Sequence, residues 1–311
     1  MKSRKDTLLV ASPFQLLCAM EWSRVENPDS IIFLRQVNNE DPKLLDEIIK
    51  NFGQGLDIRK IASHNLPTFF LSLGYLVYMA ARRRGHFLVG DIFSSRFIQK
   101  LYPFLLFNRK YLMDDGVGTL AYQNEIDQCP YKFHLYTIFD QLASKAQPNQ
   151  EIKINELTLI QAGEQAQQID HAFAGTSISG VEIIGAEVYF EDVCRLAKSV
   201  GKLAYFPHRN FNKQMMDRLR DVPEIELQEV SMPMELHLAM NHLKIKRFYT
   251  HFSSASFTLK KIQLIEQVVF LVNQNLWDNL EVRNIYQSAE EMFAVEYWQE
   301  GRLSASVVLR D

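Results

Sequence analysis

Short apolar runs alternate with segments of helical spacing along the sequence, and this rhythm constrains the fold more than any other feature. The first example is the run 7–11 (TLLVA), which ends at Ser12-Pro13 and leads into the helical segment 14–22 (FQLLCAMEW). Short apolar runs suit strands that are buried on both faces, and their alternation with helices favours a parallel sheet with helices on both sides. We therefore predict an α/β fold.

The same rhythm recurs along the rest of the chain. The first part predicts strands at 31–34, 86–89 and 110–113 and a helix at 42–52, and the second part predicts strands at 181–184, 202–206, 225–230 and 247–251 and helices at 189–200, 212–220, 233–242 and 257–273. Between the two parts, the polar segment 144–151 is typical of a linker, and the sequence has little strand character up to residue 179.

A chain of 311 residues is long enough for two domains. Two α/β units in tandem predict two Rossmann-like lobes, and we place the border at residue 170, so that the lobes are 1–170 and 171–311. Open α/β sheets bind ligands beyond the carboxyl ends of their strands. We therefore expect a ligand in a cleft between the two lobes.

Charge and cysteine content narrow the functional classes. The formal net charge of −3 gives the whole chain no attraction to nucleic acid, so we expect no nucleic-acid partner. The cysteines Cys18, Cys129 and Cys194 are scattered and form no CxxC pair, which indicates reduced thiols in a cytoplasmic compartment. Near the N-terminus the apolar run is broken by Ser12 and Pro13 without a small-residue cleavage site, so we expect no secretory signal.

The segment 66–81 (LPTFFLSLGYLVYMAA) is strongly apolar, and Arg82-Arg83-Arg84 follows it directly. It is shorter than the ~20 apolar residues that cross a bilayer. Two interpretations fit this pattern: a helix buried in the first lobe, or an interfacial helix that brings the protein to the inner membrane through 66–84. Between Arg82 and Lys110 there are seven Lys or Arg residues against one acidic residue, which suits an anionic or membrane-anchored partner and equally a solvated face.

Asp114-Asp115-Gly116 directly follows the predicted strand 110–113, at the place where an open α/β sheet carries its functional loops. Two adjacent carboxylates there can serve as a general base, as a metal site or as a cap. Gly116 allows the sharp turn that aims a side chain at a ligand. The segment is equally typical of a plain Asp-Gly turn.

Pro207-His208-Arg209 follows the predicted strand 202–206 in the same way. Imidazole and guanidinium groups both donate charge-assisted hydrogen bonds to a phosphate, and a protonated histidine can also give a proton to a leaving group. A surface His-Arg pair in a loop is the simpler interpretation of the same residues.

Ser253 and Ser254 lie between the predicted strand 247–251 and the helix that follows it. Hydroxyls and free backbone N–H groups at a helix start suit a phosphate, and serines there also serve as ordinary helix caps. Glu235, within 232–236 (MPMEL), is expected in a first helical turn. Its carboxylate either accepts hydrogen bonds from ribose hydroxyls or only complements the helix end.

The motifs DDG, PHR, PMEL and SSAS follow one another from Asp114 to Ser256, and their order is more specific than any one of them. This order resembles the bacterial sialyltransferases of glycosyltransferase family 52, the lipooligosaccharide sialyltransferases, and the related α-2,8-polysialyltransferases. Those families show a D/E-D/E-G motif, an HP motif and a serine motif in this order. The opening ASPFQLL is similar to their first strand and turn, and Ile184-Gly185-Ala186 to the first strand end of their second lobe.

The resemblance implies a GT-B fold and an inverting transferase that moves sialic acid from CMP-sialic acid to a cell-surface glycan of lipooligosaccharide or capsular type. It implies that Asp114 deprotonates the acceptor hydroxyl in the first lobe and that His208 holds the donor phosphate in the second. Further contacts with the substrates are implied for Asp115, Gly116, Gly185, Pro207, Arg209, Glu235, Ser253 and Ser254. No metal and no cofactor besides the donor are implied, and the sequence leaves a homodimer open.

One departure affects the choice of donor, because the family motif is usually His-Pro and this chain has Pro207-His208-Arg209. Another CMP-linked keto sugar therefore stays open, and a GT-B transferase with a UDP-sugar is the nearest rival. A diphosphate donor needs more cationic groups than His208 and Arg209 offer. A catalytically silent glycan- or nucleotide-binding protein is the rival from another class, and the intact Asp114, His208 and serines disfavour it.

Overall fold

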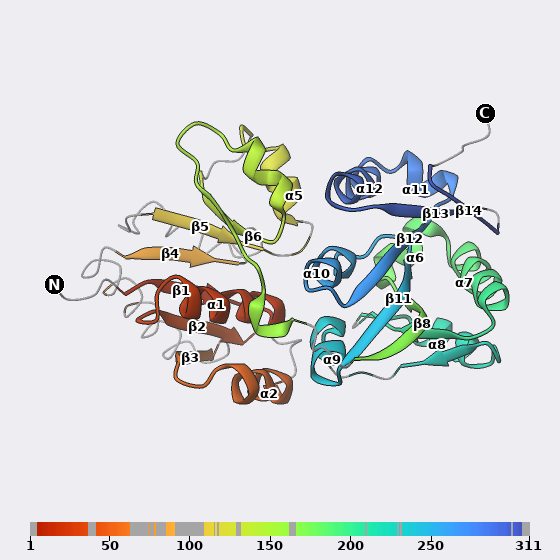
Figure 1. Ribbon diagram of the computed structural model, residues 1–311, viewed down its shortest axis with the longest axis horizontal. Coiled ribbons are helices and arrows are strands. Elements are labelled where there is room, and N and C mark those ends of the chain that lie inside the picture. Colours follow the sequence, from red (N-terminus) through yellow and green to blue (C-terminus); the bar gives the residue numbers. More distant parts are fainter. Residues whose placement is uncertain are drawn as a thin grey trace. The chain divides into compact units, whose positions relative to one another are not determined.

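The computed structural model describes residues 5–36, 42–62, 74, 78, 85–90, 109–114, 116, 118–128, 132–161, 166–208, 210–228, 230, 232–299 and 301–306. The chain divides into two compact units, Met1–Leu159 and Ile160–Asp311, each built around a seven-stranded sheet (Figure 1). Residue 170, the predicted border, lies inside strand β8 (Gln167–Ala174), which belongs to the sheet of the second unit.

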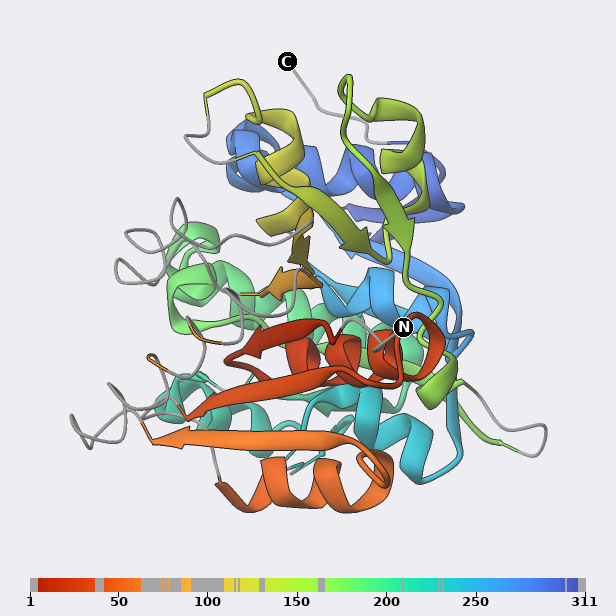
Figure 2. The ribbon, with the colours of Figure 1, turned by 90° about the vertical axis from the view of Figure 1, so that its left-hand side faces the viewer.

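The first lobe is a parallel sheet with the strand order β3-β2-β1-β4-β5-β6-β7. Figure 2 shows β1, β2 and β3 side by side, in red to orange, with helix α2 below them. The strands are β1 (Thr7–Val10), β2 (Ile31–Gln36), β3 (Asp57–Ala62), β4 (His86–Val89), β5 (Arg109–Met113), β6 (His134–Thr137) and β7 (Ile152–Ile154), and the helices are α1 (Pro13–Val25), α2 (Pro42–Phe52), α5 (Gly118–Asn124) and the 3-10 turns η2 (Asp140–Lys145) and η3 (Thr158–Ile160).

The second lobe repeats this topology in the order β10-β9-β8-β11-β12-β13-β14. All its strand pairs are parallel except β13 with β14. In Figure 1, α7 and α8 lie on one side of β8 and β11, and α9 and α10 on the other. Besides β8 the strands are β9 (Leu203–Phe206), β10 (Ile225–Leu227), β11 (Leu243–Thr250), β12 (Ile265–Leu271), β13 (Val295–Gln299) and β14 (Arg302–Ser304), and the helices are α6 (Ile178–Ile184), α7 (Ala186–Val200), α8 (Lys213–Arg220), α9 (Met234–Met240), α10 (Ala255–Lys261), α11 (Gln274–Asp278) and α12 (Leu280–Met292).

The start of the first lobe shows how local chemistry sets the elements. Ser12 caps helix α1 by accepting a hydrogen bond from the Gln15 N–H, and Pro13 occupies the first turn, where its missing N–H costs nothing. Further along the helix, Trp22 is buried and its indole N–H donates to Asp6 at 3.0 Å. The aromatic rings of Tyr111 and Tyr136 pack around it, which fixes α1 to the sheet.

Two predicted elements are wrong. Residues 181–184 were expected as a strand, but they belong to helix α6, because Ser177 caps that helix by accepting from the Gly180 N–H. The expected helix 257–273 is a short helix, α10, followed by strand β12. Gln263 breaks it with a left-handed backbone (φ 58°), and the β-branched pair Val268-Val269 favours a strand after it.

The segment 144–179 also differs from its prediction as a linker with little strand character. It contains β7 and β8, and β8 is the first strand of the second lobe and one of the two central strands of its sheet. Its amino half is polar (QQIDH), which hid the buried carboxyl half, Ala172–Ala174, from a search for apolar runs.

The predicted membrane contact lies largely outside the described residues, because only Gly74 and Tyr78 of the segment 66–84 belong to them. Among the helices that the structure describes, none combines the length and the apolar character that crossing a bilayer requires. Peripheral contact through 66–84 therefore stays a prediction.

Candidate functional site

The second lobe has a topological switch point between its central strands β8 and β11, since the chain proceeds toward β9 on one side and toward β12 on the other. Loops that follow two such strands diverge and leave room for a ligand beyond the carboxyl ends. The residues there are the turn Gly175-Thr176-Ser177 after β8 and the segment His251–Ser254 after β11. The loop after β9, which carries Pro207 and His208, lies next to them.

Close contacts join these three loops. The Gly175 N–H donates to the Phe206 carbonyl at 2.8 Å, and the Ile178 N–H donates to the Asn210 carbonyl at 3.0 Å, so the β8 turn and the β9 loop run side by side. A Cβ atom on Gly180 would lie 3.1 Å from the ring of Phe252, which places the β11 loop against the same turn. The structure therefore brings together motifs that are distant in the sequence.

His208 is half-buried, and its orientation is set by its own loop. The Asn210 N–H donates to Nδ1 of the imidazole at 3.0 Å. Because Nδ1 acts as the acceptor, a neutral imidazole carries its proton on Nε2. His208 is thus prepared to donate a hydrogen bond from Nε2. Pro207 before it is half-buried, and Arg209 lies outside the described residues.

The serines after β11 have different roles. Ser253 Oγ accepts from the Ala255 N–H at 3.2 Å, and the Ser253 carbonyl accepts from the hydroxyl of the buried Ser256 at 2.7 Å, so these two stabilise the start of α10. Ser254 occupies the cap position, is exposed, and makes no capping hydrogen bond with its side chain. Of these three, Ser254 is therefore the hydroxyl best placed for a ligand.

Glu235 stands in the first turn of α9, as predicted. This helix packs against α10, and the ring of His237 lies 6.1 Å from the ring of Phe206, so α9 borders both the serine segment and the β9 loop. Burial raises the pKa of Glu235, and its own backbone N–H opposes that effect. The carboxylate oxygens of Glu235 can accept hydrogen bonds from ligand hydroxyls.

Aromatic side chains pack beneath the switch point. His251 is buried between the rings of Phe173 and Tyr189, and burial lowers the pKa of its imidazole. The hydroxyls of Tyr189 and Tyr205 lie 2.5 Å apart, and burial raises the pKa of Tyr205 to about 12. Asp192, whose Oδ2 lies 3.6 Å from His251 Nε2, opposes the effect of burial on His251. The loops at the switch point thus lie on a layer of closely packed aromatic rings.

The structure places Gly185 apart from these residues. It joins α6 to α7 with φ 94°, which requires the left-handed backbone that glycine adopts without strain. The expected strand end at Ile184-Gly185-Ala186 is therefore a junction of two helices. The seven residues of α6 separate it from the β8 turn, about 10 Å along the helix axis.

Sequence reasoning missed the turn Gly175-Thr176-Ser177, although a signal was present. The apolar run Ala172–Ala174 is followed by a cluster of glycine, threonine and serine, which is typical of a strand that ends in a functional loop. The missed strand β8 explains the missed turn.

Gly175 must lack a side chain, because a Cβ atom there would lie 2.5 Å from the Tyr205 hydroxyl and 3.3 Å from the His208 backbone nitrogen. We expect Gly175→Ala to lower the free energy of unfolding of the second lobe by about 1–3 kcal/mol, the usual cost of overpacking, and to weaken ligand binding by displacing His208. Denaturant unfolding and ligand titration measure the two effects. Gly118→Ala is the control, since nothing lies within 4 Å of its added Cβ; equal behaviour of both variants would contradict the prediction.

In the first lobe, Asp114 follows β5 as predicted but points inward. Its side chain is fully buried, Oδ1 accepts from the Thr137 hydroxyl at 2.7 Å, and Oδ2 accepts from the Ile138 N–H at 2.5 Å. Asp114 therefore joins the carboxyl ends of β5 and β6. Gly116 has φ 63° and makes the turn that was expected, whereas Asp115 lies outside the described residues.

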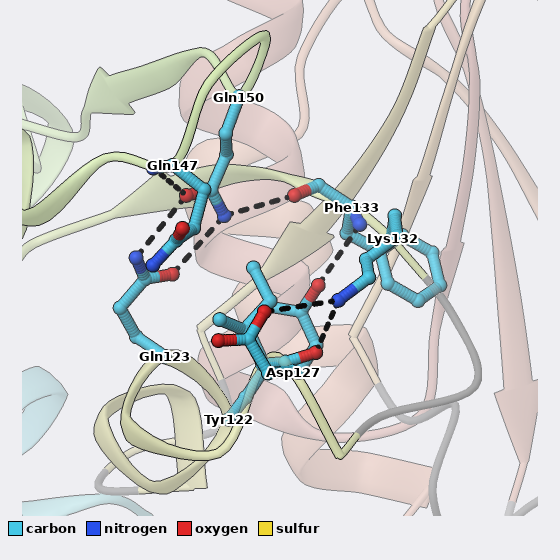
Figure 3. Close-up of polar contacts among 8 residues, drawn as sticks. Tyr122, Gln123, Asp127, Lys132, Phe133, Gln147 and Gln150 are labelled. Atoms are coloured by element: carbon cyan, nitrogen blue, oxygen red, sulfur yellow. Dashed lines mark hydrogen bonds and ion pairs between the residues drawn. The ribbon is translucent and has the colours of Figure 1, made fainter.

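A polar network holds the helix that follows this turn (Figure 3). The side-chain amides of Gln123 and Gln150 exchange two hydrogen bonds, at 3.0 and 3.1 Å, and Gln150 also donates to the Phe133 carbonyl at 3.0 Å. The Tyr122 hydroxyl accepts from the Phe133 N–H at 2.9 Å. The network joins α5 to the segments before β6 and β7 and so fixes the helix after the aspartate pair.

The described residues contain no group of three or more His, Cys, Asp or Glu side chains that could hold a metal ion.

Comparison with known proteins identifies the fold. No protein-family model and no curated protein matches the sequence. A Listeria monocytogenes protein described as a UDP-N-acetylglucosamine 2-epimerase matches with a TM-score of 0.59 and 12% identity over 92% of this chain and 87% of its own. UDP-GlcNAc 2-epimerase from Neisseria meningitidis, bound to UDP-GlcNAc, matches with a TM-score of 0.55 and 13% identity, over 91% of this chain and 90% of its own. Phytolacca americana UGT2, complexed with UDP-2-fluoro-glucose and pterostilbene, matches with a TM-score of 0.55 and 11% identity, over 97% of this chain and 88% of its own.

These likenesses extend over most of each chain, and the two sheets with their shared strand order agree with them. The fold is thus of the GT-B type, with two Rossmann-like lobes, as the sequence predicted.

Proposed function

We propose that this protein is an inverting glycosyltransferase that takes a sugar from a nucleotide donor held by the second lobe and transfers it to a glycan held by the first. CMP-sialic acid is the proposed donor, and a cell-surface glycan of lipooligosaccharide or capsular type is the proposed acceptor. The fold supports a nucleotide-sugar ligand, because the similar structures named above include complexes with UDP-sugars. The choice of CMP-sialic acid rests on the motif order in the sequence.

The observation that carries the proposal is the convergence of His208 and the serine segment with the β8 turn at the switch point of the second lobe. These residues offer an imidazole and several hydroxyls. The phosphodiester of a CMP-sugar, and the phosphate of the CMP that leaves, need donors of this kind, and the site is at the edge where Rossmann-like sheets bind nucleotides. Glu235, on the neighbouring helix α9, is the proposed partner of the ribose hydroxyls.

In the proposed reaction the acceptor hydroxyl attacks the anomeric carbon of sialic acid while the bond from that carbon to the phosphate oxygen breaks. His208 donates a hydrogen bond from Nε2 to the phosphate. When Nδ1 is also protonated, which displaces the hydrogen bond from the Asn210 N–H, the imidazolium gives its Nε2 proton to the departing CMP. Ser254 adds a hydroxyl donor to the same phosphate. Negative charge that develops on the leaving group is thereby stabilised without a second cation.

The proton of the acceptor hydroxyl goes to a carboxylate of the aspartate pair, and Asp114 is the proposed base. Its carboxylate has no exposed surface and is held by Thr137 and Ile138. In the proposed reaction an acceptor reaches Asp114 after a local rearrangement at the turn that contains Gly116. Asp115 is the alternative base in the same segment, and the variants discussed below distinguish the two.

The test is to measure CMP release from CMP-sialic acid by the purified protein, with EDTA present and with a panel of galactosides and oligosialic acids as acceptors. We expect release that depends on the acceptor and persists in EDTA. Binding of CMP-sialic acid without turnover with any acceptor would instead identify a silent binding protein. If calorimetry detects binding of a UDP-sugar but no binding of CMP-sialic acid, the donor assignment is wrong. The protein is then a transferase or an epimerase that uses a UDP-sugar.

A further inference from the structure

Two tyrosine hydroxyls meet in the buried layer beneath the switch point of the second lobe. Tyr189 of α7 and Tyr205 of β9 are both buried, and their hydroxyl oxygens lie 2.5 Å apart. A buried hydroxyl needs a hydrogen-bond partner, because an unpaired one loses its contact with water without compensation. Phenylalanine at both positions would fill nearly the same space and would need no partner, so packing alone does not explain the pair.

The hydroxyl pair lies directly against the turn that follows β8. A Cβ atom added to Gly175 would lie 2.5 Å from the Tyr205 hydroxyl and 3.3 Å from the backbone nitrogen of His208, so Gly175 lies against both. Burial raises the pKa of Tyr189, and a hydrogen bond from the N–H of the next turn residue, Thr176, opposes that effect. Both hydroxyls therefore support the same turn.

Ring packing fixes where the two hydroxyls lie. The ring of Phe173 stacks on the ring of Tyr205, with 5.4 Å between centroids and 13° between planes, and it meets the ring of Tyr189 edge-on at 6.2 Å. Phe173 and Tyr205 are in register on the paired strands β8 and β9. Because the rings are held between a sheet and the 15-residue helix α7, their hydroxyls form a fixed support for the turn.

The same turn is attached to the loop that carries His208. The Gly175 N–H donates to the Phe206 carbonyl at 2.8 Å, two residues before His208. This backbone hydrogen bond joins the turn to the β9 loop on one side, and the hydroxyl pair supports the turn from below. The position of the turn therefore affects the position of the imidazole.

We infer that Tyr189 and Tyr205 are positioning residues, whose hydroxyl pair holds the turn 175–177 and, through it, the His208 loop at the place that the donor phosphate requires. The inference rests on the proposed function, in which His208 serves the departing CMP. In this role neither hydroxyl touches the ligand, since both act through the backbone of the turn. A small displacement has a large effect in such a site, because a shift of ~1 Å in a reacting group can lower the rate ~100-fold.

The experiment compares Tyr189→Phe and Tyr205→Phe with the unmodified protein, in the full-length chain. We expect each variant to lower kcat for acceptor-dependent CMP release about tenfold, as a displacement of a fraction of an ångström predicts. KM for the acceptor should stay unchanged, because the proposed acceptor site belongs to the first lobe. The double variant should lose little more than Tyr189→Phe alone, since that single variant already breaks both hydrogen bonds.

Tyr297→Phe is the matched control, because it removes a buried hydroxyl of the same lobe, one that donates to the carboxylate of Glu290 at 2.6 Å. This variant should lower the stability of the lobe as the other two do, and it should leave kcat unchanged. If Tyr189→Phe and Tyr205→Phe lose stability and keep the kcat of the control, the two hydroxyls only stabilise the fold and the inference is overturned.

A measurement without substrate separates this inference from the proposed function. NMR of the free protein follows the ring protons of His208, assigned with His208→Asn, and the amide exchange of Thr176. We expect Tyr189→Phe and Tyr205→Phe to shift the His208 signals and Tyr189→Phe to speed the exchange, whereas Tyr297→Phe does neither. If these changes occur in a protein that releases no CMP, the proposed function fails and the positioning role stands. Unchanged His208 signals overturn the positioning role, whatever the activity.

Discussion

Replacing His208 by alanine should lower kcat/KM for acceptor-dependent CMP release by about 100-fold or more, the usual range for loss of a general acid. The variant removes the Nε2 donor and also the Nδ1 atom that accepts from the Asn210 N–H at 3.0 Å. Most of the loss should therefore come from kcat, because the leaving group loses its proton source. Initial rates with saturating acceptor measure the effect.

His208→Asn separates chemistry from loop structure. An asparagine side chain places an oxygen near the position of Nδ1, so the bond to the Asn210 N–H survives while Nε2 is absent. We expect this variant to keep the stability of the unmodified protein and to lose as much activity as His208→Ala. His134→Asn is the control, since His134 begins β6 in the first lobe and its Nδ1 accepts from the Glu151 N–H. Full activity of His208→Asn would contradict the assigned role.

Replacing Asp114 by alanine is expected to lower the free energy of unfolding of the first lobe by about 3 kcal/mol. The substitution leaves the Thr137 hydroxyl and the Ile138 N–H without their acceptor in a buried place, and each such group costs ~1–3 kcal/mol. Asp114→Asn keeps one oxygen and should lose about half as much. Denaturant unfolding, followed by a probe specific to the first lobe, measures both.

Asp127→Ala is the control for stability, because Asp127 is exposed and only pairs with Lys132 at 3.7 Å (Figure 3). We expect no measurable change for it. Activity then identifies the base: if Asp114→Asn folds and is inactive while Asp115→Asn is active, Asp114 is the base. The opposite pattern assigns the base to Asp115 and leaves Asp114 as the residue that holds the strand ends together. An Asp114→Ala protein as stable as the control would refute the structural role.

The two α/β lobes could be predicted because their evidence is local, whereas the GT-B type was implied by the resemblance of the motifs. The runs 86–89 and 42–52 became strand β4 and helix α2 with the predicted bounds, since burial on both faces and helical spacing leave direct traces in the order of residues. Glu235 is in a first helical turn for the same reason. Predictions were wrong where two local signals competed, as at 181–184 and 257–273, and where the polar amino half of β8 hid its buried half.

The neighbours of the site residues could not be predicted in this way. His208 and the serine segment come together because β9, β8 and β11 are adjacent in the sheet, and the order of strands leaves no trace in any short stretch of sequence. The close packing at Gly175 and the inward direction of Asp114 could not be predicted either, since each depends on a partner that is distant along the chain.

The sequence by itself therefore determined the two α/β lobes and the residue types at their strand ends, because the periodicity of apolar residues and the chemistry of turns act over a few residues. Only the tertiary structure decided which strand ends are neighbours and which carboxylate is buried. Those properties arise from contacts between segments that are far apart in the chain, and each contact depends on the packing of the whole sheet.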